Sequence, residues 1–306
     1  MTDPSPSLHE AINAGDLGAV ERALDAGTAI DTRTGQRFIQ DQQLTALHVA
    51  ILTISPNIRR IHLKANTARR HTASYRSIAR LLIERGADIH AETERGRMPI
   101  HLAALAGAAE LLGLLLDEGA EATARTRHGD TPLHFARTVE VARLLIENGA
   151  SVHAGGYMGM MNPTPLHEAR TAGIAGLLLD HGAGIDDTTG RNISSPLVCA
   201  VWARRIDVAH LLLERGASVD LADTNGQTPL HHAARYPDSG IVGRLLEYGA
   251  DKEVVDCDGK TPSGLALEAG LEDNIAVLTA SVLPSLGQRF WGLLRGGRRS
   301  KSAEES

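Results

Sequence analysis

The chain has 306 residues, of which 42% are hydrophobic, 22% are charged and only nine are aromatic, and its formal net charge at pH 7 is −6. This composition excludes a wholly disordered chain, because the apolar content is high enough to form a core. An ordinary enzyme core, which relies on Phe, Tyr and Trp for bulk, is not expected, so the interior is predicted to consist of Leu, Ala, Ile and Val.

Seven related tetrapeptides, taken in chain order, predict the starts of helices. In most of them Thr or Ser precedes Pro, a pair that suits a helix start because the hydroxyl accepts from a free amide and Pro has no amide to leave unpaired. Successive starts are 53, 33, 33, 31, 33 and 33 residues apart. The tetrapeptides are Thr45-Ala46-Leu47-His48, Met98-Pro99-Ile100-His101, Thr131-Pro132-Leu133-His134, Thr164-Pro165-Leu166-His167, Ser195-Pro196-Leu197-Val198, Thr228-Pro229-Leu230-His231 and Thr261-Pro262-Ser263-Gly264.

Glycines that follow leucine-rich stretches predict the ends of helices with the same period. Glycine is favoured there because it adopts the left-handed conformation that closes a helix. These glycines are Gly27, Gly86, Gly119, Gly149, Gly182, Gly216 and Gly249. The residues between each glycine and the next start alternate and contain a turn, which predicts a short β-hairpin. The repeated unit is therefore a hairpin followed by two helices.

This pattern resembles the ankyrin-repeat family, most clearly where the chain reads Asp223-Thr224-Asn225-Gly226-Gln227-Thr228-Pro229-Leu230-His231-His232-Ala233-Ala234. The resemblance covers about residues 5–283. It implies an all-α solenoid of helix-turn-helix units with short β-hairpin fingers. Eight units are expected, starting near residues 6, 45, 98, 131, 164, 195, 228 and 261. Residues 1–283 would then form the repeat array and residues 284–306 a basic, flexible tail.

A basic insertion at about residues 54–73 interrupts the second unit. Residues 54–76 contain six basic and no acidic side chains and the end of the chain, residues 285–306, has a net charge of +3, which leaves −15 for the rest of the chain. One interpretation is a site for an acidic protein surface, an anionic membrane or a phosphate backbone. The other is that the basic side chains are solvated or fold onto the acidic array. The residues concerned are Arg59, Arg60, Lys64, Arg69 and Arg70.

The finger after Gly149 is three residues longer than the usual finger and contains three of the five methionines. Exposed Met and Tyr side chains suit adaptable recognition. The alternative is that the longer loop packs against the adjacent finger. The candidate residues are Tyr157, Met158, Met160 and Met161.

The resemblance implies a concave surface, formed by the ends of the first helices and by the fingers, that holds partners. Trp202, Arg235 and Tyr236 fall at such helix ends in adjacent units and belong to the residue types that dominate binding hot spots. Arg95, Arg97, Arg127 and Asn225 fall on the fingers. For Trp202 the alternative is that it covers the helix of its neighbour.

No catalytic or metal-binding pattern is present in the sequence. Six of the fourteen histidines occupy one position of the unit, and in the ankyrin family this imidazole bonds to the neighbouring hairpin. The chain contains no Gly-x-Ser-x-Gly, no phosphate loop and no His-Glu-x-x-His motif. We therefore predict that the protein is not an enzyme, uses no cofactor and holds no metal ion.

The predicted function is that of a monomeric, non-catalytic scaffold that binds a partner protein on its concave surface. The alternative is an anion-directed adaptor that uses residues 54–76 and the tail to hold nucleic acid or an acidic membrane surface. A cytoplasmic location is expected, because two cysteines, Cys199 and Cys257, favour a reducing compartment and neither a signal peptide nor a transmembrane stretch is evident.

Overall fold

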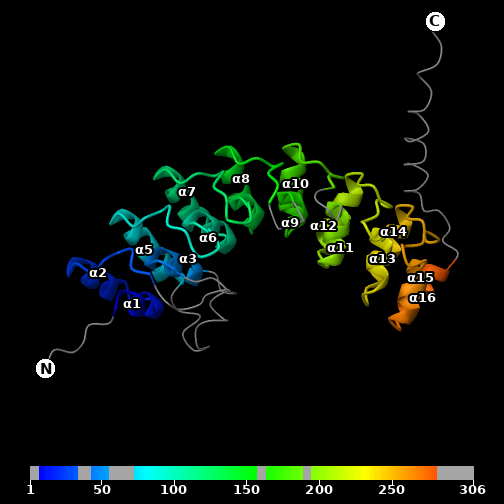
Figure 1. The fold of residues 1–306 in the computed structure, drawn as a ribbon, viewed down its shortest axis with the longest axis horizontal. Helices are drawn as coiled ribbons and strands as arrows, with labels where there is room; N and C mark the ends of the chain where they lie inside the picture. The colour runs from blue at the N-terminus through cyan, green and yellow to red at the C-terminus, as the bar shows by residue number, and fades with distance from the viewer. Residues whose placement is uncertain (1–6, 34–42, 55–71, 157–162, 189–193, 281–306) are drawn as a thin grey trace, which may run out of the picture. The chain divides into compact units, whose positions relative to one another are not determined.

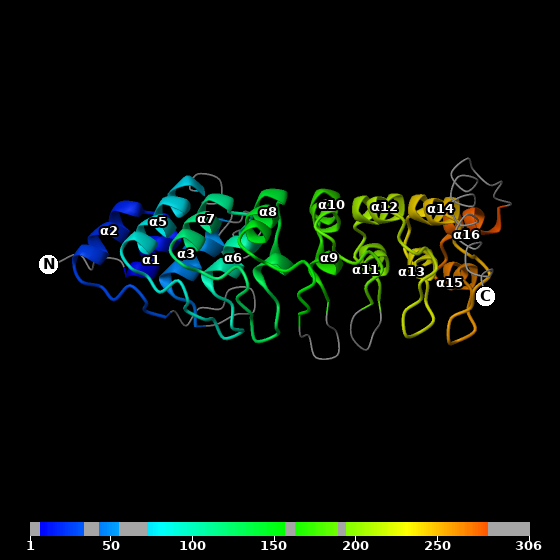
Figure 2. The same cartoon turned by 90° about the horizontal axis from the view of Figure 1, so that it is seen from above.

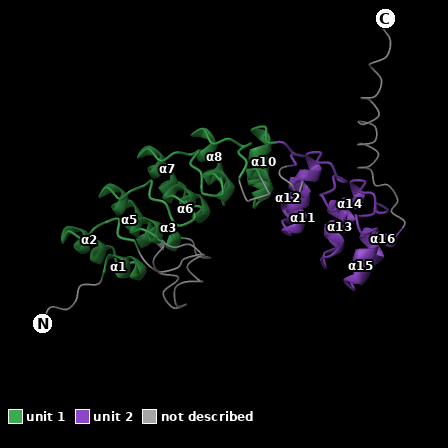
Figure 3. Ribbon diagram, viewed as in Figure 1, with its two compact units in different colours: residues 1–183 green, residues 184–306 purple. Residues whose placement is uncertain are grey.

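The computed structural model describes residues 7–33, 43–54, 72–156, 163–188 and 194–280, which form short helices joined by loops (Figure 1). The chain divides into two compact units, residues 1–183 and residues 184–306 (Figure 3). Among the described residues, strand-like pairing is limited to single bridge positions at Leu44 and Ser194. The predicted all-α fold class is confirmed, and the described parts of the predicted hairpin fingers are tight turns without strand ladders.

Unit 1 consists of helix pairs. In each pair a first helix is followed by a second, and the first helices pack on one another in one layer while the second helices form another (Figure 2). The pairs are α1 (Leu8–Ala14) with α2 (Leu17–Asp25), α3 (Ala46–Ile54) with α5 (Thr72–Glu84), α6 (Pro99–Ala106) with α7 (Ala109–Asp117), the 3-10 helix η1 (Pro132–Phe135) with α8 (Val139–Glu147), and α9 (Pro165–Glu168) with α10 (Ala172–Asp180).

Unit 2 has the same construction. First helices α11, α13 and α15 pack in sequence, as do second helices α12, α14 and α16. The pairs are α11 (Pro196–Trp202) with α12 (Ile206–Glu214), α13 (Pro229–Ala234) with α14 (Ser239–Glu247), and α15 (Pro262–Glu268) with α16 (Glu272–Thr279). The number of repeats and the end of the array at residue 283 remain predictions, because residues 281–306 lie outside the described part of the chain.

Helix starts and ends occur where the sequence places them. Proline is the first residue of α6, η1, α9, α11, α13 and α15. The hydroxyl of Ser195 accepts from the amide of Val198 at 3.3 Å, and that of Thr261 accepts from Gly264 at 3.2 Å, so each closes the first turn of its helix. The repeated glycines that follow the second helices have positive φ.

The core is aliphatic, as the composition predicts. Fully buried side chains are mainly Leu, Ile, Val and Ala, and Tyr75 is a buried exception, 1% exposed. Its hydroxyl donates to the carbonyl of Asn13 at 3.0 Å and so joins α5 to the end of α1. A stack of short helices needs few rings, because neighbouring helices supply apolar surface on both sides.

Four of the described finger tips are five-residue turns closed by two backbone bonds. In residues 93–97 the amide of Thr93 donates to the carbonyl of Arg97 at 3.0 Å and the amide of Gly96 to that of Thr93 at 2.9 Å. The same pairs recur in residues 126–130, 223–227 and 256–260. Neighbouring fingers are joined where Arg127 donates to the carbonyl of Arg95 at 3.1 Å and Cys257 to that of Asn225 at 2.9 Å. These isolated bonds hold the fingers in register without forming a sheet.

Candidate partner-binding surface

The ends of two neighbouring first helices in unit 2 present predicted binding residues to solvent. Trp202 is the last residue of α11 and is 65% exposed. Arg235 directly follows α13 and is also exposed. Because α11 and α13 pack against one another, the two side chains belong to adjacent positions of the stack. The exposure of Trp202 does not favour the interpretation in which this ring covers a neighbouring helix.

Tyr236 is half-buried. Its backbone is held by a hydrogen bond from a later helix pair of the same unit. The buried side-chain amide of Asn274, in α16, donates to the carbonyl of Tyr236 at 2.7 Å and to that of Ala234 at 3.1 Å. A third donor, the amide of Asp238, reaches the Tyr236 carbonyl at 2.7 Å. The segment that carries Arg235 and Tyr236 is therefore anchored by hydrogen bonds at its backbone.

Arg204 lies two residues after Trp202 and has a strained backbone conformation. It was not among the site residues predicted from the sequence. It is exposed and has φ +57°, in the left-handed region. Gly107 and Gly270, which occupy the corresponding position after α6 and α15, have φ +70° and +67°. A side chain at this position costs free energy that glycine avoids. An alignment of the repeated helix pairs places Arg204 where α6 and α15 are followed by glycine, so the alignment could have identified this arginine.

The fingers of unit 2 add two exposed residues. Asn225 lies at the tip of residues 223–227, and its amide donates to Asp223 at 2.8 Å. Val255, which the sequence reasoning also missed, is 55% exposed on the following finger. The corresponding residues in other fingers include Glu92, Arg125 and Ala222. A side chain that is both apolar and branched, as in Val255, is not found at this position in those three fingers.

The predicted finger residues of unit 1 divide into two kinds. Arg127 is exposed on its finger. The guanidinium of Arg97 instead lies 5.3 Å from the centre of the Phe135 ring, a cation–π contact, and this ring also meets His101 edge-on at 5.9 Å. Arg95 contributes its carbonyl to the bond with Arg127 and is half-buried. Of these three arginines, Arg127 is the most accessible.

Two groups of predicted site residues lie outside the described part of the chain. They are the basic insertion residues Arg59, Arg60, Lys64, Arg69 and Arg70, and the finger residues Tyr157, Met158, Met160 and Met161.

The repeated histidines are structural in the described units. In η1 the amide of Thr131 donates to Nδ1 of His134 at 3.0 Å, so the ring proton is on Nε2, which donates to the carbonyl of Pro163 on the next finger at 3.0 Å. His101 and His231 bond in the same way to the carbonyls of Ala124 and Lys260, at 3.1 and 3.0 Å. These three bonds connect α6, η1 and α13 to the fingers that follow them.

Burial makes these imidazoles resist protonation. It is the largest cause that lowers the pKa of His101 to about 4, and it lowers the pKa of His134 and of His231. A neutral ring is required, because Nδ1 must accept a hydrogen bond. In the part of the chain that the structure describes, no group of three His, Cys, Asp or Glu side chains could hold a metal ion.

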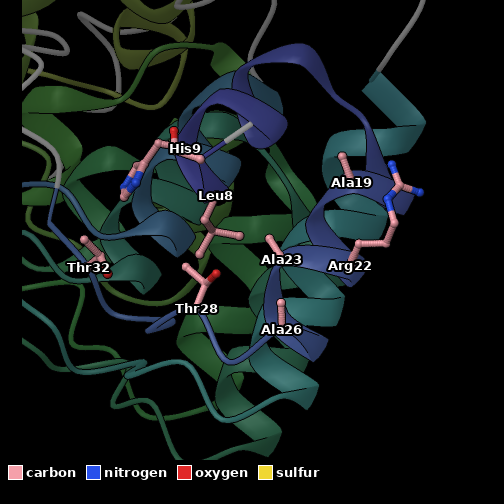
Figure 4. A pocket seen from close by; sticks show the side chains of 9 residues that line it. Leu8, His9, Ala19, Arg22, Ala23, Ala26, Thr28 and Thr32 are labelled. Atoms are coloured by element: carbon pink, nitrogen blue, oxygen red, sulfur yellow. The ribbon is translucent and has the colours of Figure 1, made fainter. Parts of the chain in front are cut away.

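A pocket of about 320 Å³ lies in the first helix pair, apart from the predicted binding residues (Figure 4). It lies between α1, α2 and the segment that follows α2. Burial lowers the pKa of His9 on its wall. The lining residues are Ser7, Leu8, His9, Ala19, Arg22, Ala23, Ala26, Thr28 and Thr32.

No described helix has the length and apolar character needed to cross a membrane.

Comparisons with known proteins identify the family. Residues 68–156 match a family described as "Ankyrin repeats (3 copies)", residues 212–266 match "Ankyrin repeats (many copies)", and residues 193–224 match "Ankyrin repeat". The chain belongs to the ankyrin-repeat family. Ankyrin repeats are in general non-catalytic modules for protein–protein interaction.

Two individual proteins illustrate the similarity. The ankyrin repeat domain of human ASB11, known from a crystal structure, is 28% identical with a TM-score of 0.58, and the match covers 68% of this chain and 94% of that one. A segment of 39 residues is 54% identical to a putative palmitoyltransferase, ZDHHC13, from Danio rerio. That match covers 13% of this chain and only 6% of the fish protein.

Proposed function

We propose that the protein is a non-catalytic, monomeric scaffold that binds a partner protein through one surface of unit 2. This surface, the Trp202 surface, comprises Trp202, Arg204, Arg235, Asn225 and Val255. The observation that carries the proposal is the 65% exposure of Trp202 at a helix end. Exposed tryptophan is costly in water and is the residue type most enriched in binding hot spots.

The chemistry of the surface favours an acidic, partly apolar segment of the partner. Arg204 and Arg235 are exposed, and their guanidinium groups can each bind a carboxylate through two hydrogen bonds. Trp202 and Val255 supply the apolar contacts. The helices and the anchored segment at residues 235–236 hold these groups before binding, so little entropy is lost when the partner arrives.

Location and the remaining predicted residues belong to the same proposal. The two cysteines, Cys199 half-buried and Cys257 exposed, do not form a disulfide, which supports a reducing compartment such as the cytoplasm. Arg127, exposed on a finger of unit 1, remains a separate candidate for partner recognition. No described residue favours the anion-directed alternative, since the basic insertion lies outside the described ranges.

The test is affinity capture with mass spectrometry, using the full chain and variants. Trp202→Ala and Arg235→Ala should each remove the captured partner while helical circular dichroism stays unchanged. Arg244→Ala is the matched control for Arg235→Ala, because Arg244 is an exposed arginine on α14 of unit 2, outside the Trp202 surface. Capture that survives both substitutions contradicts the proposal. If it is then lost on deletion of residues 55–71 and at high salt, the anion-directed alternative is favoured.

A further inference from the structure

The last described helix pair has an exposed apolar side chain at a position where the corresponding side chain of earlier pairs is buried. Leu267 is the sixth residue of α15 and is 70% exposed. The sixth residues of α6, α11 and α13 are Ala104, Val201 and Ala234, which are 0%, 2% and 0% exposed. Each of those helices packs against the first helix that follows it. Leu267 therefore occupies a buried position of the repeat without the neighbour that normally buries it.

The second helix shows the same uncovered side. Ile275, the fourth residue of α16, is half-buried, whereas Ala209 and Val242 at that position of α12 and α14 are 0% exposed. Leu271 stands at the N-cap of α16, a position that Arg205 and Asp238 hold in the earlier helices. Leu267, Leu271 and Ile275 form what we call the open face.

The open face is not built to receive another finger. In α6, η1 and α13 the third residue is a histidine whose ring reaches the following finger, as His231 does with the carbonyl of Lys260, whereas α11 has Val198 there. In α15 this residue is Gly264, which has no side chain. An apolar segment without a finger is consequently a better occupant than a further ankyrin unit.

The chain leaves α16 at a fixed point within reach of this face. Lys252 donates to the carbonyls of Leu278 and Ala280, at 3.0 and 3.4 Å, and so secures the end of the helix. Leu267 and Leu271 lie at the opposite end of α16, about 12 Å away for a helix of eight residues. About four extended residues cover that distance, and nine residues lie between Ala280 and Phe290.

The sequence after residue 280 complements the open face in polarity and charge. Leu286, Phe290 and Leu293 follow one another at intervals of four and three residues, with Trp291 between them. Residues 285–306 have a net charge of +3, and the first turn of α16 beside Leu271 carries the exposed acids Glu272 and Asp273. Opposite charges bordering an apolar contact fix its orientation.

We propose that the segment 281–306 folds back onto the open face of its own chain, so that Phe290 and Trp291 cover Leu267. This contact is independent of the Trp202 surface. It closes the array with a segment that is not itself a repeat.

Tryptophan fluorescence tests the contact directly. The chain has two tryptophans, so Trp202→Phe leaves Trp291 as the sole emitter. In this background Trp291 should emit at shorter wavelength than the isolated peptide 281–306. Adding Leu267→Asp should shift the emission to that of the peptide. Adding Arg244→Asp, which alters an exposed residue of α14 outside both the open face and the Trp202 surface, should leave it unchanged.

Three outcomes would overturn the proposal. The first is emission from Trp291 that already equals that of the peptide, and the second is emission that does not respond to Leu267→Asp. The third is a blue shift that disappears on dilution, which would place the segment on a second copy. Should Leu267→Asp reduce helicity, Phe290→Asp replaces it, because that substitution leaves the described helices intact and should produce the same red shift.

Discussion

The side-chain amide of Asn274 lies 2.7 Å from the carbonyl of Tyr236, 38 residues earlier in the chain. The same amide also reaches Ala234, so one buried side chain holds the end of α13 and the segment that carries Arg235. In this way the last helix pair helps to shape the proposed partner-binding surface.

Asn274→Ala should lower the free energy of unfolding by about 2 kcal/mol, because it leaves two carbonyls without this donor. It should also weaken partner capture, because the anchored segment loosens. Urea unfolding followed by circular dichroism measures the first effect. Thr279→Ala is the control, since its exposed hydroxyl bonds only within α16 and its loss should change stability by less than about 0.5 kcal/mol. Equal effects of the two substitutions would refute the anchoring role.

Arg204→Gly should stabilise the protein by about 1 kcal/mol, because glycine adopts the left-handed conformation without the side-chain penalty. The same substitution should reduce partner capture, since it removes a guanidinium from the Trp202 surface. A gain in stability with a loss of binding is the pattern expected where a functional residue occupies a strained position.

Ala203→Gly serves as the comparison for Arg204→Gly, because Ala203 has φ −79° and glycine gains nothing there. That variant should be less stable than the parent chain in the same urea titration. If Arg204→Gly is also destabilising, the backbone at residue 204 is not strained.

Protonation of His101 should lower the free energy of unfolding at acidic pH. Its pKa is about 4 in the folded chain against an ordinary value of 6.5, so between these values the unfolded chain binds the proton more readily. The contribution is fully present above pH 6.5, declines as the pH falls toward 4 and then levels off, with a total of about 3 kcal/mol.

His101→Val isolates this contribution, because Val198 shows that the position accepts valine. Urea midpoints measured at pH 7 and at pH 4.5 should differ less for the variant than for the parent chain. The variant loses the bond to Ala124 and is expected to be less stable at both values, so the comparison rests on the difference between them. Identical pH dependence in both proteins would show that His101 titrates normally.

Features that repeat along the chain could be predicted from the sequence. The Ser/Thr-Pro pairs and the glycines mark helix starts and ends through local backbone chemistry, which needs no knowledge of the neighbours. The aliphatic core follows from the small number of aromatic residues. The role of the histidines followed from the family resemblance, and the bonds of His101, His134 and His231 agree with it.

Features that depend on contacts between units could not be predicted. The stacking of Arg97 on Phe135 joins residues 38 positions apart, and no periodic signal distinguishes this arginine from an exposed one. The side chains of Asn274 and Lys252 donate hydrogen bonds to backbone carbonyls. Every residue has such a carbonyl, so the sequence does not identify the acceptors. Arg204 and Val255 could have been recognised by aligning the units, since each departs from what its register position holds elsewhere.

The imidazole bonds that join α6, η1 and α13 to the next finger have a consequence for folding kinetics. His134 and Pro163 are 29 residues apart, as are His231 and Lys260, so these links close only short loops. Chains stabilised by such local contacts fold one helix pair after another. They unfold in the same stepwise manner when they are pulled from their ends. Val198 leaves α11 without a ring bond to its following finger, and that joint is where extension of unit 2 under load is expected to begin.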